Sequence, residues 1–210
     1  MDVVDQILQT KVVPVVAIDD AANAAELAKA LVAGNLPIAE VTFRTAAAEE
    51  SIRAMSGESD ILVGAGTVIS PAQVDTAVDA GARFVVCPGL SAPVVERCRE
   101  REVPVFPGAV TATEVMAALE LGLDTVKFFP ASTNGGAAAI KALSAPFGQV
   151  KFIPTGGVSL DNLSDYLAVK SVIAVGGSWM VGKDLINAGN FDEITRIAAA
   201  AVARAAELRP

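Results

Sequence analysis

Histidine is absent from this chain of 210 residues. Without histidine the protein cannot form a Ser-His-Asp or Cys-His nucleophile pair, and it lacks the commonest protein ligand of zinc and other transition metals. Any general base must therefore be a glutamate, aspartate, lysine, tyrosine or cysteine. We expect a protein that uses neither a metal ion nor another cofactor.

Cysteine and aromatic residues are scarce as well. Cys87 and Cys98 fall in a predicted strand and a predicted helix, and we expect buried structural thiols rather than a disulfide. Aromatic residues make up 5% of the chain while the hydrophobic fraction is 52%, and this composition suits strands that are covered on both faces by closely packed helices. We expect one α/β domain over residues 1–210, with a single core.

Long apolar segments and clustered basic residues are also missing. No apolar run reaches about 18 residues, and there is no basic, apolar, small-residue leader, so we expect neither a membrane span nor a signal peptide. The formal net charge is −8 with scattered lysines and arginines, whereas a nucleic-acid surface needs a clustered basic patch. We therefore expect a cytoplasmic protein that acts on a small molecule, with no nucleic-acid or membrane partner.

Apolar, β-branched runs recur about every 20 to 27 residues along the chain. Eight such runs lie at residues 12–18, 38–43, 61–65, 84–87, 103–106, 125–129, 151–154 and 172–175. Helix-like segments lie at residues 22–33, 46–55, 71–80, 92–101, 112–121, 136–144, 160–168 and 191–207. Eight strand-helix units with short connections predict a (β/α)₈ barrel, also called a TIM barrel.

Two further features bear on this prediction. Residues 2–9 place apolar side chains at helical spacing after Asp2, a possible cap, and predict a short amphipathic helix that covers one end of the barrel.

The alternative fold is a doubly wound open sheet. Its dinucleotide fingerprint is not matched, because the GAGT segment at 64–67 lacks the third glycine.

Lys127 is the most informative residue, because it interrupts the apolar run DTVKFFPA at 124–131. Burial disfavours the charged form of an amine, and a neutral lysine is a nucleophile that can form a Schiff base with a carbonyl substrate. The alternative is a lysine at a strand end whose ammonium group reaches solvent.

The second strand carries an acid and a base in the segment IAEVTFRT. Strand alternation places Glu40, Thr42 and Arg44 on one face, which we expect to point into the barrel. One reading is a buried Glu-Arg ion pair, although such pairs rarely increase stability. The functional reading combines a carboxylate base with a guanidinium that binds a substrate carboxylate.

Glycine pairs follow the last two strands, at 156–157 and 176–177. Each pair alone is ordinary turn sequence. In many barrels of this kind, however, the loops after strands seven and eight bind phosphate through backbone N–H groups. We therefore expect a phosphate site at these loops.

Seven short segments carry a specific resemblance. They are EVTFRT (40–45), VGAGTV (63–68), CPG (87–89), VKFFPA (126–131), NGG (134–136), PTGG (154–157) and GGSW (176–179). In this order, over nearly the whole chain, they resemble the 2-keto-3-deoxy-6-phosphogluconate (KDPG) and 4-hydroxy-2-oxoglutarate aldolase family. The resemblance implies a class I aldolase on a homotrimeric (β/α)₈ barrel that cleaves KDPG to pyruvate and D-glyceraldehyde 3-phosphate.

The same resemblance implies a role for each matched residue. Lys127 matches the Schiff-base lysine and Glu40 the proton-transferring carboxylate, while Arg44 and Thr67 match contacts to the pyruvate carboxylate. The remaining matches line the site (Pro88, Phe129 and Thr155) or receive the phosphate (Gly156, Gly157, Gly177 and Ser178). Many members carry glutamate after FFPA, where this chain has Ser132, so the polarity at that position stays open.

Several alternatives remain at this point. Within the aldolases, the preferred substrate could be 4-hydroxy-2-oxoglutarate, which yields pyruvate and glyoxylate, or the galactonate epimer of KDPG. A non-catalytic phosphosugar-binding barrel would keep the glycine pairs without needing Lys127 and Glu40. An oligomeric interaction protein with no site would leave those two residues and Arg44 as unexplained inward charges.

Overall fold

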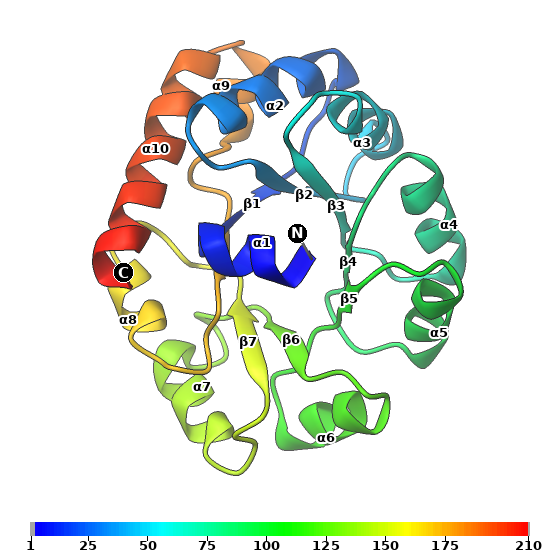
Figure 1. Ribbon diagram of the computed structural model, residues 1–210, viewed down its shortest axis with the longest axis vertical. Coiled ribbons are helices and arrows are strands. Elements are labelled where there is room, and N and C mark those ends of the chain that lie inside the picture. Colours follow the sequence, from blue (N-terminus) through cyan, green and yellow to red (C-terminus); the bar gives the residue numbers. More distant parts are fainter. Residues whose placement is uncertain (1–2, 210) are drawn as a thin grey trace.

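Within residues 3–209, which the computed structural model describes, strands alternate with helices along the chain (Figure 1). The strands are β1 (Val12–Val16), β2 (Ile38–Thr42), β3 (Leu62–Gly66), β4 (Val85–Val86), β5 (Val105–Phe106), β6 (Thr125–Phe128), β7 (Lys151–Pro154) and β8 (Val175–Gly177). The helices are α1 (Val3–Thr10), η1 (Ala21–Asn23), α2 (Ala24–Ala33), α3 (Ala48–Ser56), α4 (Pro71–Asp79), α5 (Ala92–Glu100), α6 (Ala112–Glu120), α7 (Gly136–Ser144), α8 (Leu163–Leu167), α9 (Lys183–Asn187) and α10 (Phe191–Leu208).

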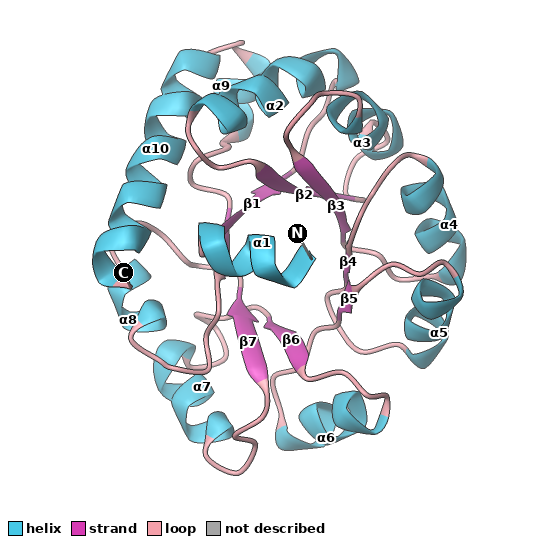
Figure 2. Cartoon of the chain, in the orientation of Figure 1, coloured by secondary structure: helices cyan, strands magenta, loops and turns pink. Residues whose placement is uncertain are grey.

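The strands are all parallel and form a curled sheet with helices on its outer side (Figure 2). Six of them form one sheet in the order β5-β4-β3-β2-β1-β8, and β6 pairs with β7 in a second, two-stranded sheet. Single parallel bridges join the two sheets, from Gly108 to Lys127 on one side and from Thr155 to Gly176 on the other. The α/β class with a parallel sheet is therefore confirmed.

The strands are buried on both faces, which explains their continuous apolar sequences. Residues of β2 and β3 show almost no exposed surface, as expected for parallel strands between a filled interior and a layer of helices. Small residues let the helices approach closely. A Cβ atom on Gly34, just after α2, would lie 2.7 Å from the Cβ of Ala198 in α10.

Helix α1 lies across the amino-terminal end of the strands (Figure 1). Its Ile7 side chain is buried and lines a small void that also reaches Lys127. The predicted amphipathic helix is thus confirmed with bounds shifted by one residue, from 2–9 to 3–10. The expected cap, Asp2, lies outside the described residues.

The eighth strand differs from the prediction. The run at 172–175 forms only a single bridge to β7, through Val172, and the strand itself continues through the glycine pair at 176–177, which pairs with Val13 and Pro14 of β1. Glycine is required here by packing, since a Cβ on Gly176 would lie 2.3 Å from Thr155 Oγ1. The helical segment predicted at 22–33 is divided into η1 and α2. The short helix α9 is not predicted, because one or two helical turns leave little periodicity to detect.

Two kinds of feature are absent from the residues that the structure describes: a membrane-spanning helix and a metal-binding cluster of side chains. No helix between residues 3 and 209 is long and apolar enough to cross a membrane. In the same part of the chain, no group of three or more cysteine, aspartate or glutamate side chains is arranged to hold a metal ion.

Both cysteines are free and buried. Burial raises the pKa of Cys87 to about 12 and the pKa of Cys98 to about 11. Because the thiolate is the reactive form, we predict that neither thiol reacts with Ellman's reagent at mildly alkaline pH unless the protein unfolds. Rapid labelling of the folded protein would contradict this burial.

Candidate active site

Lys127 of β6 and Glu40 of β2 meet in the interior enclosed by the curled strands. Lys127 Nζ lies 3.0 Å from Glu40 Oε1, and the two side chains are only 7% and 4% exposed. The residues are 87 positions apart in sequence, so the contact depends on the curl of the sheet. The sequence suggested each residue separately, and the structure brings them together.

This contact decides between earlier alternatives. Lys127 does not reach solvent from a strand end, because it lies within β6 and is buried. Glu40 pairs with Lys127, so the alternative of a buried Glu40–Arg44 ion pair is wrong. Arg44 is exposed and lies two residues beyond the end of β2 at Thr42, where strand alternation no longer applies.

Gly66 provides the space for the Glu40 carboxylate. A Cβ atom on Gly66 would lie 2.2 Å from Glu40 Oε1, and Gly66 pairs with Thr42 on the neighbouring strand. The Thr42 hydroxyl in turn donates to the carbonyl oxygen of Val16 at 2.8 Å. The space around the carboxylate therefore results from a glycine that sequence reasoning did not single out, although it forms part of the VGAGT segment.

Two further residues surround the lysine. The ring of Phe129, immediately after β6, has its centroid 5.1 Å from Lys127 Nζ, which is cation-π distance. Thr155, immediately after β7, is 5% exposed, and its Oγ1 has no hydrogen-bond partner among residues 3–209. Thr155, Lys127 and Glu40 line the same small void of about 10 Å³. An unpartnered buried hydroxyl beside the pair is available to a bound molecule.

The other predicted contacts lie where strands end. Arg44, Thr67 and Pro88 follow the carboxyl ends of β2, β3 and β4 by one or two residues. Thr67 has a φ of 59°, a left-handed conformation that a threonine rarely adopts. Such strained backbone positions cluster at functional sites. The three residues thus lie at the strand ends where barrels place their chemistry.

The loops after β7 and β8 present free backbone donors. Gly156 and Gly157 have φ values of 95° and 77°, which only glycine adopts readily. Neither of their N–H groups, nor that of Ser178, donates to a backbone carbonyl within residues 3–209. Unpaired N–H groups on adjacent loops form an anion-binding surface.

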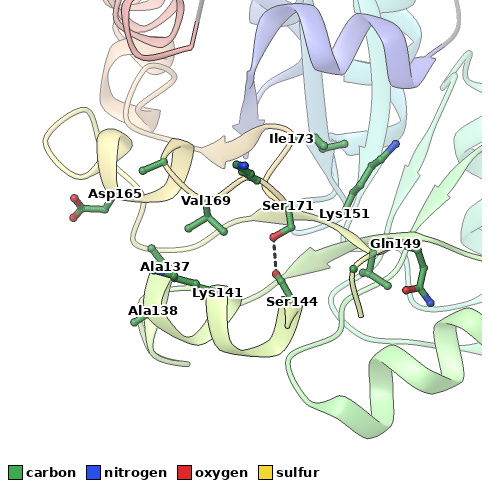
Figure 3. A pocket seen from close by; sticks show the side chains of 14 residues that line it. Ala137, Ala138, Lys141, Ser144, Gln149, Lys151, Asp165, Val169, Ser171 and Ile173 are labelled. Atoms are coloured by element: carbon green, nitrogen blue, oxygen red, sulfur yellow. Dashed lines mark hydrogen bonds between the residues drawn. The ribbon is translucent and has the colours of Figure 1, made fainter. Parts of the chain in front are cut away.

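A separate groove lies between α7 and α8, with a volume of about 860 Å³ (Figure 3). Its wall includes Lys141, Lys151 and Asp165, and the hydroxyls of Ser144 and Ser171 share a hydrogen bond of 2.5 Å. The groove includes the first residue of β7, so it opens toward the amino-terminal ends of the strands. None of the predicted site residues lines this groove.

Comparison with known proteins gives a consistent picture. Residues 3–197 match the family described as "Aldolase: KDPG and KHG aldolase". The chain is 47% identical over 195 residues to the 2-dehydro-3-deoxy-phosphogluconate aldolase of Dickeya dadantii, with 92% of each chain covered. It is 46% identical over 192 residues to the KHG/KDPG aldolase of Escherichia coli K12, which covers 91% of this chain and 90% of that protein.

A similar solved structure is KDPG aldolase from Legionella pneumophila, with a TM-score of 0.91 and 38% identity over 96% of this chain and 98% of that chain. In that crystal structure, pyruvate was captured at low pH as a covalent carbinolamine intermediate. A carbinolamine forms when an amine adds to a ketone. The structural relative therefore carries an amine adduct of a keto acid.

The geometry around Gly66 makes a prediction that does not depend on function. Gly66→Ala should lower the free energy of unfolding by about 1–3 kcal/mol, because the new methyl group overlaps the Glu40 carboxylate in a closed interior. Gly148→Ala is the matched control, since a Cβ at Gly148 meets nothing within 4 Å. Equal stability of the two variants in urea unfolding would contradict the placement of Glu40.

Proposed function

Because the chain belongs to the KDPG and KHG aldolase family, we propose that it is a class I aldolase that reversibly cleaves KDPG to pyruvate and D-glyceraldehyde 3-phosphate. The observation that carries the proposal is the buried contact of 3.0 Å between Lys127 Nζ and Glu40 Oε1. Cleavage of a carbon-carbon bond beside a carbonyl needs an electron sink. An iminium ion on Lys127 supplies that sink.

The reaction begins with the addition of Lys127 to the C2 ketone of the substrate. The lysine attacks as a neutral amine, and the adjacent Glu40 carboxylate offers a direct acceptor for the ammonium proton. Loss of water from the carbinolamine then gives the iminium ion. The low exposure of both side chains limits competition from bulk water during these steps.

Glu40 then acts on the C4 hydroxyl group, directly or through a water molecule. As it removes the hydroxyl proton, the C3–C4 bond breaks and its electron pair moves into the iminium system to form an enamine. Glyceraldehyde 3-phosphate leaves. Glu40 helps to return a proton to C3, and hydrolysis of the resulting iminium frees pyruvate and restores the lysine.

Substrate binding uses groups at the carboxyl ends of the strands. We assign Arg44 and Thr67 to the substrate carboxylate, since a guanidinium binds a carboxylate through two parallel hydrogen bonds. Arg44 is absent from the salt bridges found among residues 3–209. The residues assigned to the walls of the site are Pro88, Phe129 and Thr155.

The phosphate group is assigned to the glycine loop that follows β7 and to the carboxyl end of β8. Gly156, Gly157, Gly177 and Ser178 are the proposed contacts, and the unpaired N–H groups of three of them support this assignment. Backbone donors suit a dianion without requiring a positive side chain. The loops lie beside the site, because Thr155 both borders the lysine and immediately precedes Gly156.

A second candidate substrate is 4-hydroxy-2-oxoglutarate, because the relative from E. coli is named a KHG/KDPG aldolase. Its cleavage to pyruvate and glyoxylate would use the same lysine chemistry. The galactonate epimer of KDPG is a third candidate, and a protein described as KDPGal has a TM-score of 0.82 at 29% identity. The three substrates share the pyruvate half and differ in the aldehyde half.

We further propose that the two sheets form one closed (β/α)₈ barrel, which is the single domain expected over residues 1–210. The bridges from Gly108 to Lys127 and from Thr155 to Gly176 support closure, because they join the six-stranded sheet to β6 and β7 at both edges. The homotrimer implied by the family resemblance and the cytoplasmic location stay predictions.

Replacing Glu40 with glutamine tests the mechanism. Glu40→Gln keeps the shape and a hydrogen-bonding group but cannot accept a proton, so KDPG cleavage should fall by about 10²- to 10⁴-fold. Exchange of the pyruvate methyl protons with solvent deuterium should fall as well, because exchange requires the enamine. Coupled pyruvate detection and proton NMR measure the two rates.

Glu207→Gln is the matched control, because Glu207 forms an exposed ion pair with Arg204 on α10. This control should cleave and exchange at the wild-type rates. Exchange at the wild-type rate in Glu40→Gln would show that Glu40 is not the base. A wild-type protein that neither cleaves KDPG nor exchanges pyruvate protons would overturn the aldolase assignment itself.

A further inference from the structure

Two threonines of the segment EVTFRT, Thr42 and Thr45, have no part in the proposed chemistry, yet both form hydrogen bonds to the carboxyl end of β1. The Thr42 hydroxyl donates to Val16 O at 2.8 Å, and the Thr45 hydroxyl donates to Ile18 O at 2.5 Å. Arg44, which we assign to the substrate carboxylate, lies between the two threonines in the chain. Its backbone is therefore bracketed by two side-chain anchors.

The Thr45 hydrogen bond lies beyond the point where backbone pairing stops. The parallel register of β1 and β2 ends at Val16 and Val41. In the part of the chain that the structure describes, no backbone hydrogen bond joins residues 17–20 to residues 43–48. The bond from the Thr45 hydroxyl is thus the one hydrogen bond between these two described loops.

The other side of the Arg44 loop is held by β3. Phe43 N donates to Gly66 O at 2.8 Å, and Arg44 N donates to Thr42 O at 2.7 Å, which closes a tight turn. Thr67, the second residue assigned to the substrate carboxylate, directly follows Gly66. Arg44 and Thr67 therefore flank one hydrogen bond, and on the β1 side the position of the arginine is left to the threonine hydroxyls.

The carboxylates near this anchor already have partners. Asp19 and Asp20 directly follow Ile18, the acceptor for the threonine hydroxyl. Asp19 pairs with Lys183 at 2.6 Å, and Asp20 accepts a hydrogen bond of 2.9 Å from a backbone N–H group of η1. Neither forms a salt bridge with Arg44 within residues 3–209. Anchoring the loop to β1 therefore leaves the guanidinium available to the carboxylate of a ligand.

We propose that Thr45 is a positioning residue, whose hydroxyl holds the Arg44 loop against the end of β1 so that the guanidinium meets the substrate carboxylate through two parallel hydrogen bonds. Such bidentate binding depends on angle as well as on distance. Arg44 is exposed, and an exposed arginine side chain samples many rotamers. The fold can limit this freedom by fixing the backbone from which the side chain extends. This inference rests on the proposed aldolase function and on the assignment of Arg44.

The test measures KM and kcat for KDPG in wild type, Thr45→Val, Thr45→Ser, Arg44→Met and the double variant that combines Arg44→Met with Thr45→Val. Valine keeps the shape of threonine and loses the hydroxyl, so KM should rise by about 3- to 10-fold, the usual effect of one hydrogen bond. The kcat should change little, because the carboxylate is bound equally in the ground state and the transition state. Thr45→Ser keeps a hydroxyl and should restore a KM close to that of wild type.

The double variant distinguishes positioning from a general structural effect. Arg44→Met alone should raise KM by about 10- to 100-fold, because it removes hydrogen bonds to a charged group. If Thr45 acts through Arg44, adding Thr45→Val to Arg44→Met should leave KM within about twofold of the single variant. An effect that is independent of the arginine would instead multiply in the double variant.

Thr195→Val is the matched control, because the Thr195 hydroxyl also joins two elements, donating from α10 to Ala30 O of α2 at 3.0 Å. This control should keep the wild-type KM. A second measurement is the pyruvate concentration that gives half-maximal trapping by borohydride. It should follow the same order as KM, because pyruvate carries the carboxylate that Arg44 is proposed to bind.

The outcomes separate this inference from the proposed function. If wild type neither cleaves KDPG nor is trapped with pyruvate, the function itself is wrong. If wild type is active while Thr45→Val keeps the wild-type KM, the role of Thr45 is wrong and the aldolase assignment stands. A KM increase that multiplies with that of Arg44→Met, or that Thr45→Ser does not reverse, would equally overturn the role of Thr45. Should Arg44→Met fail to fold by circular dichroism, Arg44→Lys takes its place, since a lysine cannot form the two parallel hydrogen bonds.

Discussion

The buried contact between Lys127 and Glu40 is the constraint on which the rest of this structure depends. Removing an amine and a carboxylate from water costs free energy, and their mutual attraction seldom returns a net gain in stability. A chain that keeps both groups in its interior therefore requires a reason beyond stability. The Schiff-base chemistry that we propose would supply that reason, because it needs an amine that can lose its proton and a carboxylate that can carry one.

Other parts of the fold leave the space that this contact needs. Gly66 leaves room for the carboxylate, and Gly176 leaves room for the Thr155 hydroxyl beside the lysine. Helix α1 covers the amino-terminal end of the strands, and its Ile7 lines the same small void as the pair. The polar groups that follow the carboxyl ends of the strands lie at the opposite end, which α1 does not cover. In barrel enzymes the chemistry likewise lies at the carboxyl ends of the strands.

Much of the fold follows from sequence periodicity, because the apolar runs are separated by helix-length segments with glycine or capping residues at their ends. Lys127 and Glu40 could be selected because each interrupts an apolar strand. Their pairing could not be predicted, since alternation within one strand gives the face of a residue but not its neighbour on a strand that is distant in sequence. The inward direction expected for Arg44 rested on strand alternation, which does not extend to a residue beyond the end of β2. Gly66 was missed, and Gly176 was interpreted only as part of a glycine pair at a phosphate site, because the packing need for glycine at both positions arises from contacts between strands.

The measurement that tests the central claim most directly is reductive trapping of pyruvate. Treatment of the protein with pyruvate and borohydride, followed by peptide mass spectrometry, should place a stable adduct on the peptide that contains Lys127 and on no other lysine. Lys127→Met should form no adduct, while Lys141→Met, which changes an exposed lysine in the groove between α7 and α8, should be trapped as wild type is. An adduct on another lysine, or wild-type trapping in Lys127→Met, would contradict the assignment of Lys127 as the Schiff-base residue.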